Sequence, residues 1–185
     1  MAEHVCHWWL GPILASPLRK LVQNPKVILG PHIREGMTVL EPGCGMGFFT
    51  LEAAQMVGPR GKVVAADLQP KMLEGLKKRL LKAGLSERVD ARLTQANRLG
   101  VSDLNATVDL ALAIYMVHEV PDQPGFFSEV AATLKPGASL LVVEPKNHVS
   151  EKAFDASLAV AASMGCAVES RPSIRRSYAA VLRRV

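Results

Sequence analysis

Short runs rich in β-branched and aliphatic residues alternate with longer segments of helical periodicity along most of this chain. Runs that are apolar throughout, without strict alternation, are typical of strands buried on both faces. Repeated strand–helix units require right-handed crossovers and a parallel sheet covered by helices. The pattern therefore predicts an α/β fold, a three-layer α/β/α sandwich, with central strands at residues 37–41, 62–67, 88–93, 108–114 and 139–144.

Helical segments are expected at residues 48–57, 70–83, 123–134 and 151–164. The second of them begins at Pro70, which suits a first helical position, and is followed by Gly84, which suits a position just past a helix end. After the third, the sequence Lys135-Pro136-Gly137 predicts a turn that leads into the fifth strand.

The last part of the chain departs from the strand–helix alternation. Residues 166–170 and 177–184 have strand character and are joined by a short polar link that contains Pro172. A connection this short cannot join parallel strands. The sequence therefore predicts a seven-stranded, mostly parallel sheet that ends in an antiparallel hairpin at its C-terminal edge.

The composition excludes several classes of protein. Of the 185 residues, 49% are hydrophobic and 21% charged, which excludes a disordered chain. No apolar stretch approaches the ~18 residues of a membrane helix, and no signal-peptide pattern is evident. The three cysteines include no C-x-x-C pair, so neither a disulfide framework nor a zinc knuckle is indicated, and a reduced, cytoplasmic setting is expected.

The charge is uneven along the chain. Lysine and arginine number 22 against 17 acidic residues, a net charge of +5, and residues 151–185 carry six basic and three acidic side chains. A solvated basic edge that discourages pairing with other sheets is the leading interpretation. Contact with RNA or another anion stays open as the alternative.

A glycine-rich loop follows the first predicted strand, with the sequence Glu41-Pro42-Gly43-Cys44-Gly45-Met46-Gly47. Glycines at such a junction permit a tight turn and the close approach of a ligand. A dinucleotide-binding loop needs its third glycine three residues after the second, where this chain has Phe48. A phosphate-binding P-loop is excluded as well, because no Gly-Lys-Ser or Gly-Lys-Thr follows.

The G-x-G-x-G spacing, with Glu41 two residues before Gly43, resembles motif I of the class I S-adenosylmethionine-dependent methyltransferases. The runs at residues 64–73, 108–113 and 135–138 resemble further signatures of that family, in the same order. The resemblance covers about residues 37–185. It implies a Rossmann-like methyltransferase domain at residues 31–185, preceded by an N-terminal helical lid or substrate segment at residues 1–30.

The resemblance also implies S-adenosylmethionine as cofactor and S-adenosylhomocysteine as product. Asp67 would accept hydrogen bonds from the ribose hydroxyls, and Leu68 would lie against the adenosine. Gln95 and Asn97 stand where the family often places an acidic adenine-binding residue, and they either take that role or cap the next helix. The full set of cofactor-binding residues implied is Glu41, Gly43, Cys44, Gly45, Gly47, Asp67, Leu68, Gln95, Asn97 and Ala113.

For two of these residues the sequence gives a more specific expectation. Cys44 is expected to be a buried spacer and not a nucleophile, because no histidine or aspartate partner stands near it in sequence. Glu41 is expected beneath the loop, where it holds either the loop itself or the ammonium of the cofactor through water.

Candidate catalytic residues follow the fourth predicted strand. His118 is the best candidate for a general base, since its ordinary pKa lies near 6.5. A hydrogen-bonded structural histidine is the alternative. Tyr115 either positions the acceptor or packs on the cofactor, and Glu119 either orients His118 or caps the following helix.

Candidate substrate residues lie at two places. Trp8 and Trp9 either seal the site or stack on an acceptor, or else dock the segment onto the sheet. Lys146 and His148 follow the fifth strand and either bind an acidic group or belong to a solvated loop. No metal site is expected, because His4, Cys6 and His7 are too crowded to form one.

The sequence therefore predicts methyl transfer from S-adenosylmethionine to a small-molecule acceptor of undetermined chemistry. No Asn-Pro-Pro-Tyr-like motif follows the fourth strand, and His118-Glu119-Val120 resembles quinone- and small-metabolite-type enzymes. The alternatives are an RNA-modifying methyltransferase and a non-catalytic cofactor-binding protein. We expect no nucleic-acid partner, no membrane span, and a monomer or homodimer.

Overall fold

The computed structural model describes residues 23–185 and, before them, Trp8, Gly11, Ala15, Ser16 and Arg19. Its contacts divide the chain into two compact units. The described residues up to Thr94 form the N-terminal unit, and Gln95–Val185 form the C-terminal unit.

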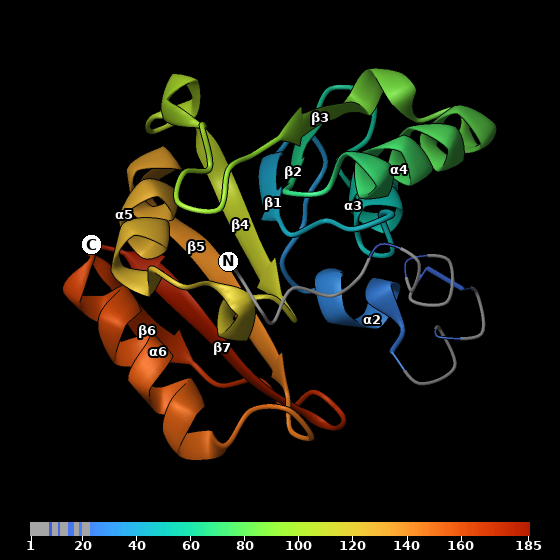
Figure 1. Ribbon diagram of the computed structural model, residues 1–185. Helices are drawn as coiled ribbons and strands as arrows, with labels where there is room; N and C mark the ends of the chain where they lie inside the picture. The colour runs from blue at the N-terminus through green and yellow to red at the C-terminus, as the bar shows by residue number, and fades with distance from the viewer. Residues whose placement is uncertain (1–7, 9–10, 12–14, 17–18, 20–22) are drawn as a thin grey trace. The chain divides into compact units, whose positions relative to one another are not determined.

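The N-terminal unit contains three parallel strands in the order β3-β2-β1 (Figure 1). Helix α3 contacts β2, and α4 contacts both β2 and β3. The elements are α2 (Pro25–Leu29), β1 (Thr38–Pro42), α3 (Thr50–Met56), β2 (Lys62–Asp67), α4 (Pro70–Ala83), the 3₁₀ turn η3 (Ser86–Arg88) and β3 (Val89–Leu93). The strands were expected in these places: β2 has the expected bounds, and the ends of β1 and β3 differ from the expected ones by one residue at most.

Helix α4 has the bounds that the sequence predicts. Four of its apolar side chains are buried, namely Met72, Leu73, Leu76 and Leu80. Leu81 recurs at helical spacing with them but is 77% exposed, because it lies at the rim of the apolar stripe. The helix ends at Gly84, which has a φ of 67° and donates its N–H toward the carbonyls of Leu80 and Leu81.

The C-terminal unit contains four strands in the order β4-β5-β7-β6 (Figure 1). Helices α5 and α6 pack together, and α6 also contacts β6. The elements are η4 (Ser102–Leu104), β4 (Val108–Ile114), η5 (Val117–Glu119), α5 (Gln123–Thr133), β5 (Leu134–Pro145), α6 (Glu151–Ser163), β6 (Cys166–Ser170) and β7 (Ser177–Arg184). Buried Phe127, Phe154 and Leu112 are among the largest side chains of its core.

The turn expected at residues 135–137 lies inside β5. The pairing with β4 jumps from Val108↔Leu134 to Leu110↔Ser139, so four residues of β5 bulge out between two paired positions. Lys135 at this bulge pairs with Asp109 at 2.5 Å, which holds the bulge against the neighbouring strand. Pro136 and Gly137 therefore mark a bulge and not a connection between elements.

The predicted hairpin is confirmed with its bounds, since β7 is antiparallel to both β5 and β6. The seven described strands form a mixed sheet, as the sequence predicts. Strand β6 lies at the edge, where Arg183 pairs with Glu169 at 2.7 Å. Arg171, just past β6, pairs with Asp155 at 2.7 Å. Two of the excess arginines thus take part in ion pairs. None of the described helices is both long and apolar enough to cross a bilayer.

The left-handed cap of α4 gives a test of local stability. An added Cβ at Gly84 would contact none of the described residues within 4 Å, so the backbone conformation is what opposes a side chain there. We expect Gly84→Ala to lower the free energy of unfolding in urea by about 1–2 kcal/mol. Gly84→Asn should cost less, because asparagine tolerates this region. Equal losses for both variants would contradict the explanation.

Candidate active site

The glycine loop begins where β1 ends. Gly43, Gly45 and Gly47 have φ values of 68°, 54° and 81°, which residues with a Cβ rarely adopt. Among the described residues, a Cβ at Gly45 would meet nothing within 4 Å, whereas a Cβ at Gly47 would clash with side chains of the neighbouring helices, including Leu51 at 2.9 Å. Gly45 thus leaves open space in front of its backbone, and Gly47 lets the helices pack closely.

Asp67, the last residue of β2, is bound to the glycine loop. Its Oδ2 accepts a hydrogen bond from the Gly45 N–H at 2.8 Å, and its Oδ1 accepts one from the Gln69 N–H at 2.9 Å. Burial raises the pKa of Asp67, while these backbone donors partly offset the effect. Each carboxylate oxygen keeps accepting capacity, so the side chain suits a ligand with neighbouring hydroxyls.

Glu41 lies on β1, two residues before Gly43, and is almost completely buried, at 3% exposure. Burial raises its pKa to about 8, with a smaller opposing effect from the nearby Thr50 hydroxyl. Among the described residues, nothing completes a hydrogen bond to its Oε2. A buried acceptor without a partner is costly, and it suits a ligand that brings an N–H donor.

Cys44 lies in surroundings that disfavour a thiolate. It is 6% exposed, and its Sγ lies 3.6 Å from the Gly45 carbonyl oxygen. Burial raises the pKa of the thiol, and the charges of Glu41 and Asp67 raise it further. Reactive cysteines need the opposite, an electropositive and accessible setting.

Sequence analysis missed the link between α4 and the loop. The Arg79 guanidinium, half-buried on α4, donates to the Met46 carbonyl oxygen at 2.5 Å. A Cβ at Gly75, one turn earlier, would lie 2.8 Å from the Met46 side chain. The signal in the sequence was Gly75 itself, a glycine inside a helix of good helix formers.

The residues expected around the adenosine separate into three settings. Leu68 is 37% exposed beside Asp67. Gln95 and Asn97 are exposed in a tight turn of the C-terminal unit, closed by reciprocal backbone bonds between Gln95 and Arg98. The alternative that they cap the next helix is wrong, because η4 follows Val101 and has no side-chain cap. Ala113 is fully buried within β4.

Tyr115 follows β4 in a left-handed conformation, with a φ of 60°. Its N–H donates to the Val143 carbonyl oxygen at 2.8 Å, and its hydroxyl lies 2.9 Å from the Ser177 Oγ on β7. A bulky residue with positive φ is strained, so the neighbouring strands must hold it in place.

His118 and Glu119 lie on η5, immediately after Tyr115 and Met116. The His118 Nδ1 forms a short hydrogen bond with the Glu144 Oε2, and its Nε2 lies 3.9 Å from the Glu119 Oε1. The hydrogen bond to Glu144 raises the pKa of His118, against the opposing effect of burial. Glu119 does not cap the following helix, because Asp122 accepts the capping bond from the Gly125 N–H.

Glu144 is the second residue that sequence analysis missed. It lies on β5 with its side chain 2% exposed, and its Oε1 accepts the N–H groups of Met116 at 3.1 Å and Val117 at 2.9 Å. The available signal was an acidic residue near the end of an apolar strand, without a motif to mark it.

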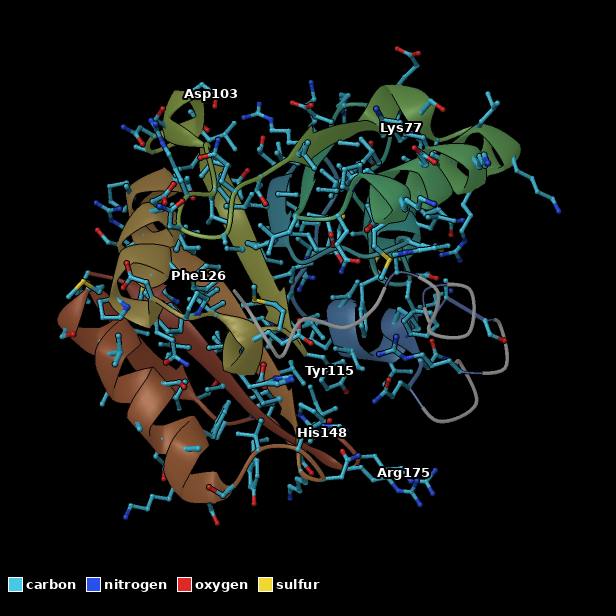
Figure 2. The ribbon with its side chains drawn as sticks, in the orientation of Figure 1. Lys77, Asp103, Tyr115, Phe126, His148 and Arg175 are labelled. Carbon is cyan, nitrogen blue, oxygen red and sulfur yellow. The ribbon has the colours of Figure 1, made fainter. Side chains whose placement is uncertain are left out.

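Lys146 and His148 lie in the segment after β5. The His148 ring centroid is 6.2 Å from that of His118, and the Lys146 Nζ lies 4.8 Å above the Tyr178 ring. Figure 2 shows Tyr115, His148 and Arg175 at the same end of the C-terminal unit. The β4 and β5 ends therefore bring Tyr115, His118, Glu119, Glu144 and His148 into one cluster.

Trp8 is 44% exposed in the N-terminal unit, and the Lys71 Nζ on α4 lies 4.2 Å from its ring centroid. Trp9, His4, Cys6 and His7 lie outside the described residues, as does most of the segment at residues 1–30. Among the residues that the structure describes, no three His, Cys, Asp or Glu side chains are placed to hold a metal ion.

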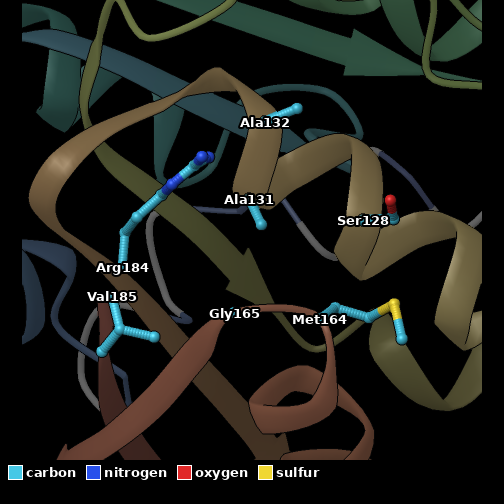
Figure 3. A pocket seen from close by; sticks show the side chains of 7 residues that line it. All are labelled: Ser128, Ala131, Ala132, Met164, Gly165, Arg184 and Val185. Carbon is cyan, nitrogen blue, oxygen red and sulfur yellow. The ribbon is translucent and has the colours of Figure 1, made fainter.

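A pocket of about 250 Å³ lies elsewhere in the C-terminal unit (Figure 3). Its lining comes from α5, the turn before β6 and the end of β7, and includes Ser128, Met164 and Arg184. None of the predicted site residues lines this pocket.

Comparison with known proteins decides the family. A family model for a methyltransferase domain matches residues 33–171. The chain belongs to the class I S-adenosylmethionine-dependent methyltransferases. Its fold agrees, since a methyltransferase of this kind from Aquifex aeolicus superposes with a TM-score of 0.87 at 24% identity, covering 98% of this chain and 100% of that one.

Relatives in the family differ in what they are named for. The ubiquinone/menaquinone biosynthesis C-methyltransferase UbiE of Pseudomonas fluorescens is 32% identical over 150 residues, which is 80% of this chain and 57% of that protein. An arsenite methyltransferase of Halobacterium salinarum is 31% identical over 119 residues, covering 64% and 29%. The chain thus spans little more than half the length of the UbiE relatives it matches, 50–57%.

The buried Glu41 predicts a dependence of stability on pH. The unfolded chain ionises this side chain near pH 4.5, whereas the folded protein keeps the proton to about pH 8. Raising the pH across this interval favours the unfolded state, by about 1.4 kcal/mol for each unit of pKa difference. Glu41→Gln should remove that loss, so that its free energy of unfolding falls less than that of the wild type between pH 5 and pH 9.

Urea unfolding at the two pH values measures this difference. Parallel pH profiles for the variant and the wild type would contradict the raised pKa.

Proposed function

We propose that this chain transfers a methyl group from S-adenosylmethionine to a small-molecule acceptor. The observation that carries the proposal is the bond between the Gly45 N–H and the Asp67 carboxylate, at a loop of three left-handed glycines. This bond joins the Asp67 carboxylate to the loop at Gly45, whose missing side chain leaves room for a ligand. The family match and the fold support the same reading.

The residues of the N-terminal unit fit this cofactor. Asp67 would bind the ribose hydroxyls, Leu68 would cover one face of the adenosine, and the backbone at Gly43–Gly45 would face the methionine portion. Glu41 would satisfy its unpartnered oxygen with the ammonium, either directly or through water. Gln95 and Asn97 remain candidates for the adenine. The cofactor, when bound, supplies an already activated methyl group, so the chain chiefly aligns the acceptor and excludes water.

The acceptor side of the proposal rests on the C-terminal unit. His118 would accept a proton from the acceptor, and Tyr115 and Glu119 would position the acceptor and the imidazole. Lys146 and His148 lie in the segment beside this cluster and would contact the acceptor. The segment at residues 1–30, with Trp8 and Trp9, would cover the bound molecule. The names of the relatives, a quinone-biosynthesis C-methyltransferase and an arsenite methyltransferase, support a small acceptor.

An RNA substrate is less well supported. Arg171 and Arg183, part of the basic excess that suggested it, form ion pairs with Asp155 and Glu169. We also propose a reducing, cytoplasmic setting, which suits the free thiols of Cys44 and Cys166. A monomer or homodimer remains our expectation.

Cofactor binding and turnover test the proposal separately. We expect calorimetry to show binding of S-adenosylmethionine, and a screen of phenols, thiols, amines and carboxylates to release S-adenosylhomocysteine with at least one class. Binding without transfer to any acceptor would favour a non-catalytic protein. Absence of binding would refute the proposal itself.

Asp67→Asn should weaken binding of S-adenosylmethionine by about 1.5–3 kcal/mol, or roughly 10–100-fold, since it removes a charged acceptor. Asparagine keeps one acceptor oxygen for the backbone, which makes it gentler on the loop than alanine. The matched control is Asp90→Asn on the neighbouring strand β3, whose carboxylate pairs with Arg92 at 2.8 Å. Equal affinities of the Asp67 variant and the control would remove Asp67 from the ribose role.

A further inference from the structure

The cluster at the ends of β4 and β5 contains a buried carboxylate that has hydrogen bonds at both of its oxygens. Glu144 accepts two backbone N–H groups at Oε1 and the His118 ring at Oε2, and its side chain is 2% exposed. An ionised carboxylate only accepts hydrogen bonds. With Glu144 ionised, the proton in the bond to His118 belongs to Nδ1, which leaves Nε2 as the basic nitrogen of the neutral ring.

The other ring nitrogen is placed differently. Nε2 lies 3.9 Å from the nearest Glu119 oxygen, too far for a hydrogen bond, and the His118 side chain is 28% exposed. One nitrogen is thus fixed by a buried carboxylate, and the other has no such bond among the described residues. This is the arrangement of a carboxylate–histidine pair that accepts protons.

We propose that Glu144 is the positioning residue that holds His118 with Nε2 as proton acceptor, and that the methyl acceptor is a weakly acidic hydroxyl of the phenol or enol class. This inference rests on the proposed function and deepens it. A phenol or enol keeps its proton at neutral pH and becomes a strong nucleophile when it loses that proton, which is the step that a neutral imidazole at this position supplies.

The proton passes from the acceptor hydroxyl to the His118 ring. The acceptor O–H bond breaks, its electron pair stays on the acceptor oxygen, and the proton forms a new N–H bond at Nε2. The ring becomes an imidazolium, stabilised by the carboxylate of Glu144 at Nδ1 and by Glu119 near Nε2. After the reaction this proton leaves to solvent through the exposed side of the ring.

Three titratable groups face His118 among the described residues: Glu144 from β5, Glu119 from η5 and His148 from the segment after β5. The two carboxylates favour the charged ring, and a protonated His148 would disfavour it. The net effect raises the pKa of His118. Turnover should therefore rise with pH through a value above 6.5, because only the neutral ring accepts a proton.

Glu144→Gln is the decisive variant. The amide oxygen can still accept the two backbone N–H groups, while the amide NH₂ turned toward Nδ1 donates to it. The ring then carries its proton on Nε2 and loses its basic face. We expect kcat to fall by roughly 10²–10⁴-fold, with little change in the affinity for S-adenosylmethionine.

A readout independent of turnover comes from ¹⁵N NMR of the histidine rings. In the wild-type protein, neutral His118 should be protonated at Nδ1, and in Glu144→Gln it should be protonated at Nε2 with a lower pKa. Glu129→Gln is the matched control, because Glu129 also accepts two backbone N–H groups, from Leu99 and Gly100, without a histidine partner. The control should leave both the tautomer and the pKa of His118 unchanged.

The outcomes distinguish a failure of the Glu144–His118 pair, the dyad, from a failure of the proposed function. Neutral wild-type His118 protonated at Nε2 would overturn the dyad even if Glu144→Gln failed to fold. If His118→Ala and Glu144→Gln each lower kcat and the double variant lowers it no further, the two residues act as a unit. Additive losses would overturn that unit. A chain with the predicted tautomer that does not bind S-adenosylmethionine would refute the proposed function alone.

Discussion

The hydrogen bond from the Gly45 N–H to the Asp67 carboxylate joins the two parts of the sequence on which the proposed cofactor site depends. It connects the loop after β1 to the end of β2, and the Cys44 N–H adds a second link to the Ala66 carbonyl oxygen. Because β1 and β2 are parallel and paired residue by residue, their ends are fixed by the buried sheet. The loop inherits its position from that packing.

Much of the fold could be predicted because its elements are marked locally. Pro70 and Gly84 delimit α4, and the apolar runs of β2 and β4 identify them as buried strands. The bulge in β5 could not be predicted, because a sequence such as Lys135-Pro136-Gly137 suits a turn between two elements as well as a bulge within one strand. Only the pairing with β4, a long-range property, distinguishes the two.

Sequence analysis identified the candidate site residues that belong to a motif. It missed the residues whose roles come from tertiary contacts. Asp67 stands at a fixed distance from the glycine loop in sequence, so its motif marks it. Glu144 has no motif, and its role depends on His118 being brought to it from η5, 26 residues earlier. Arg79 is one of several cations on α4, and only the fold shows that it reaches the Met46 carbonyl. Glu119, Gln95 and Asn97 were each also considered as helix caps. The structure excludes that alternative, because other residues occupy the cap positions.

Gly75 shows that the glycine loop lowers the stability of a neighbouring helix. The interior of α4 would be about 0.5–1 kcal/mol more stable with alanine at this position, judged by helix formation alone. The side chain of Met46 occupies the space where that methyl group would stand. Positions 46 and 75 therefore constrain each other, and a family member with a larger residue on this helix face would need a smaller residue in its loop. Selection on the loop would then also act on position 75 of helix α4.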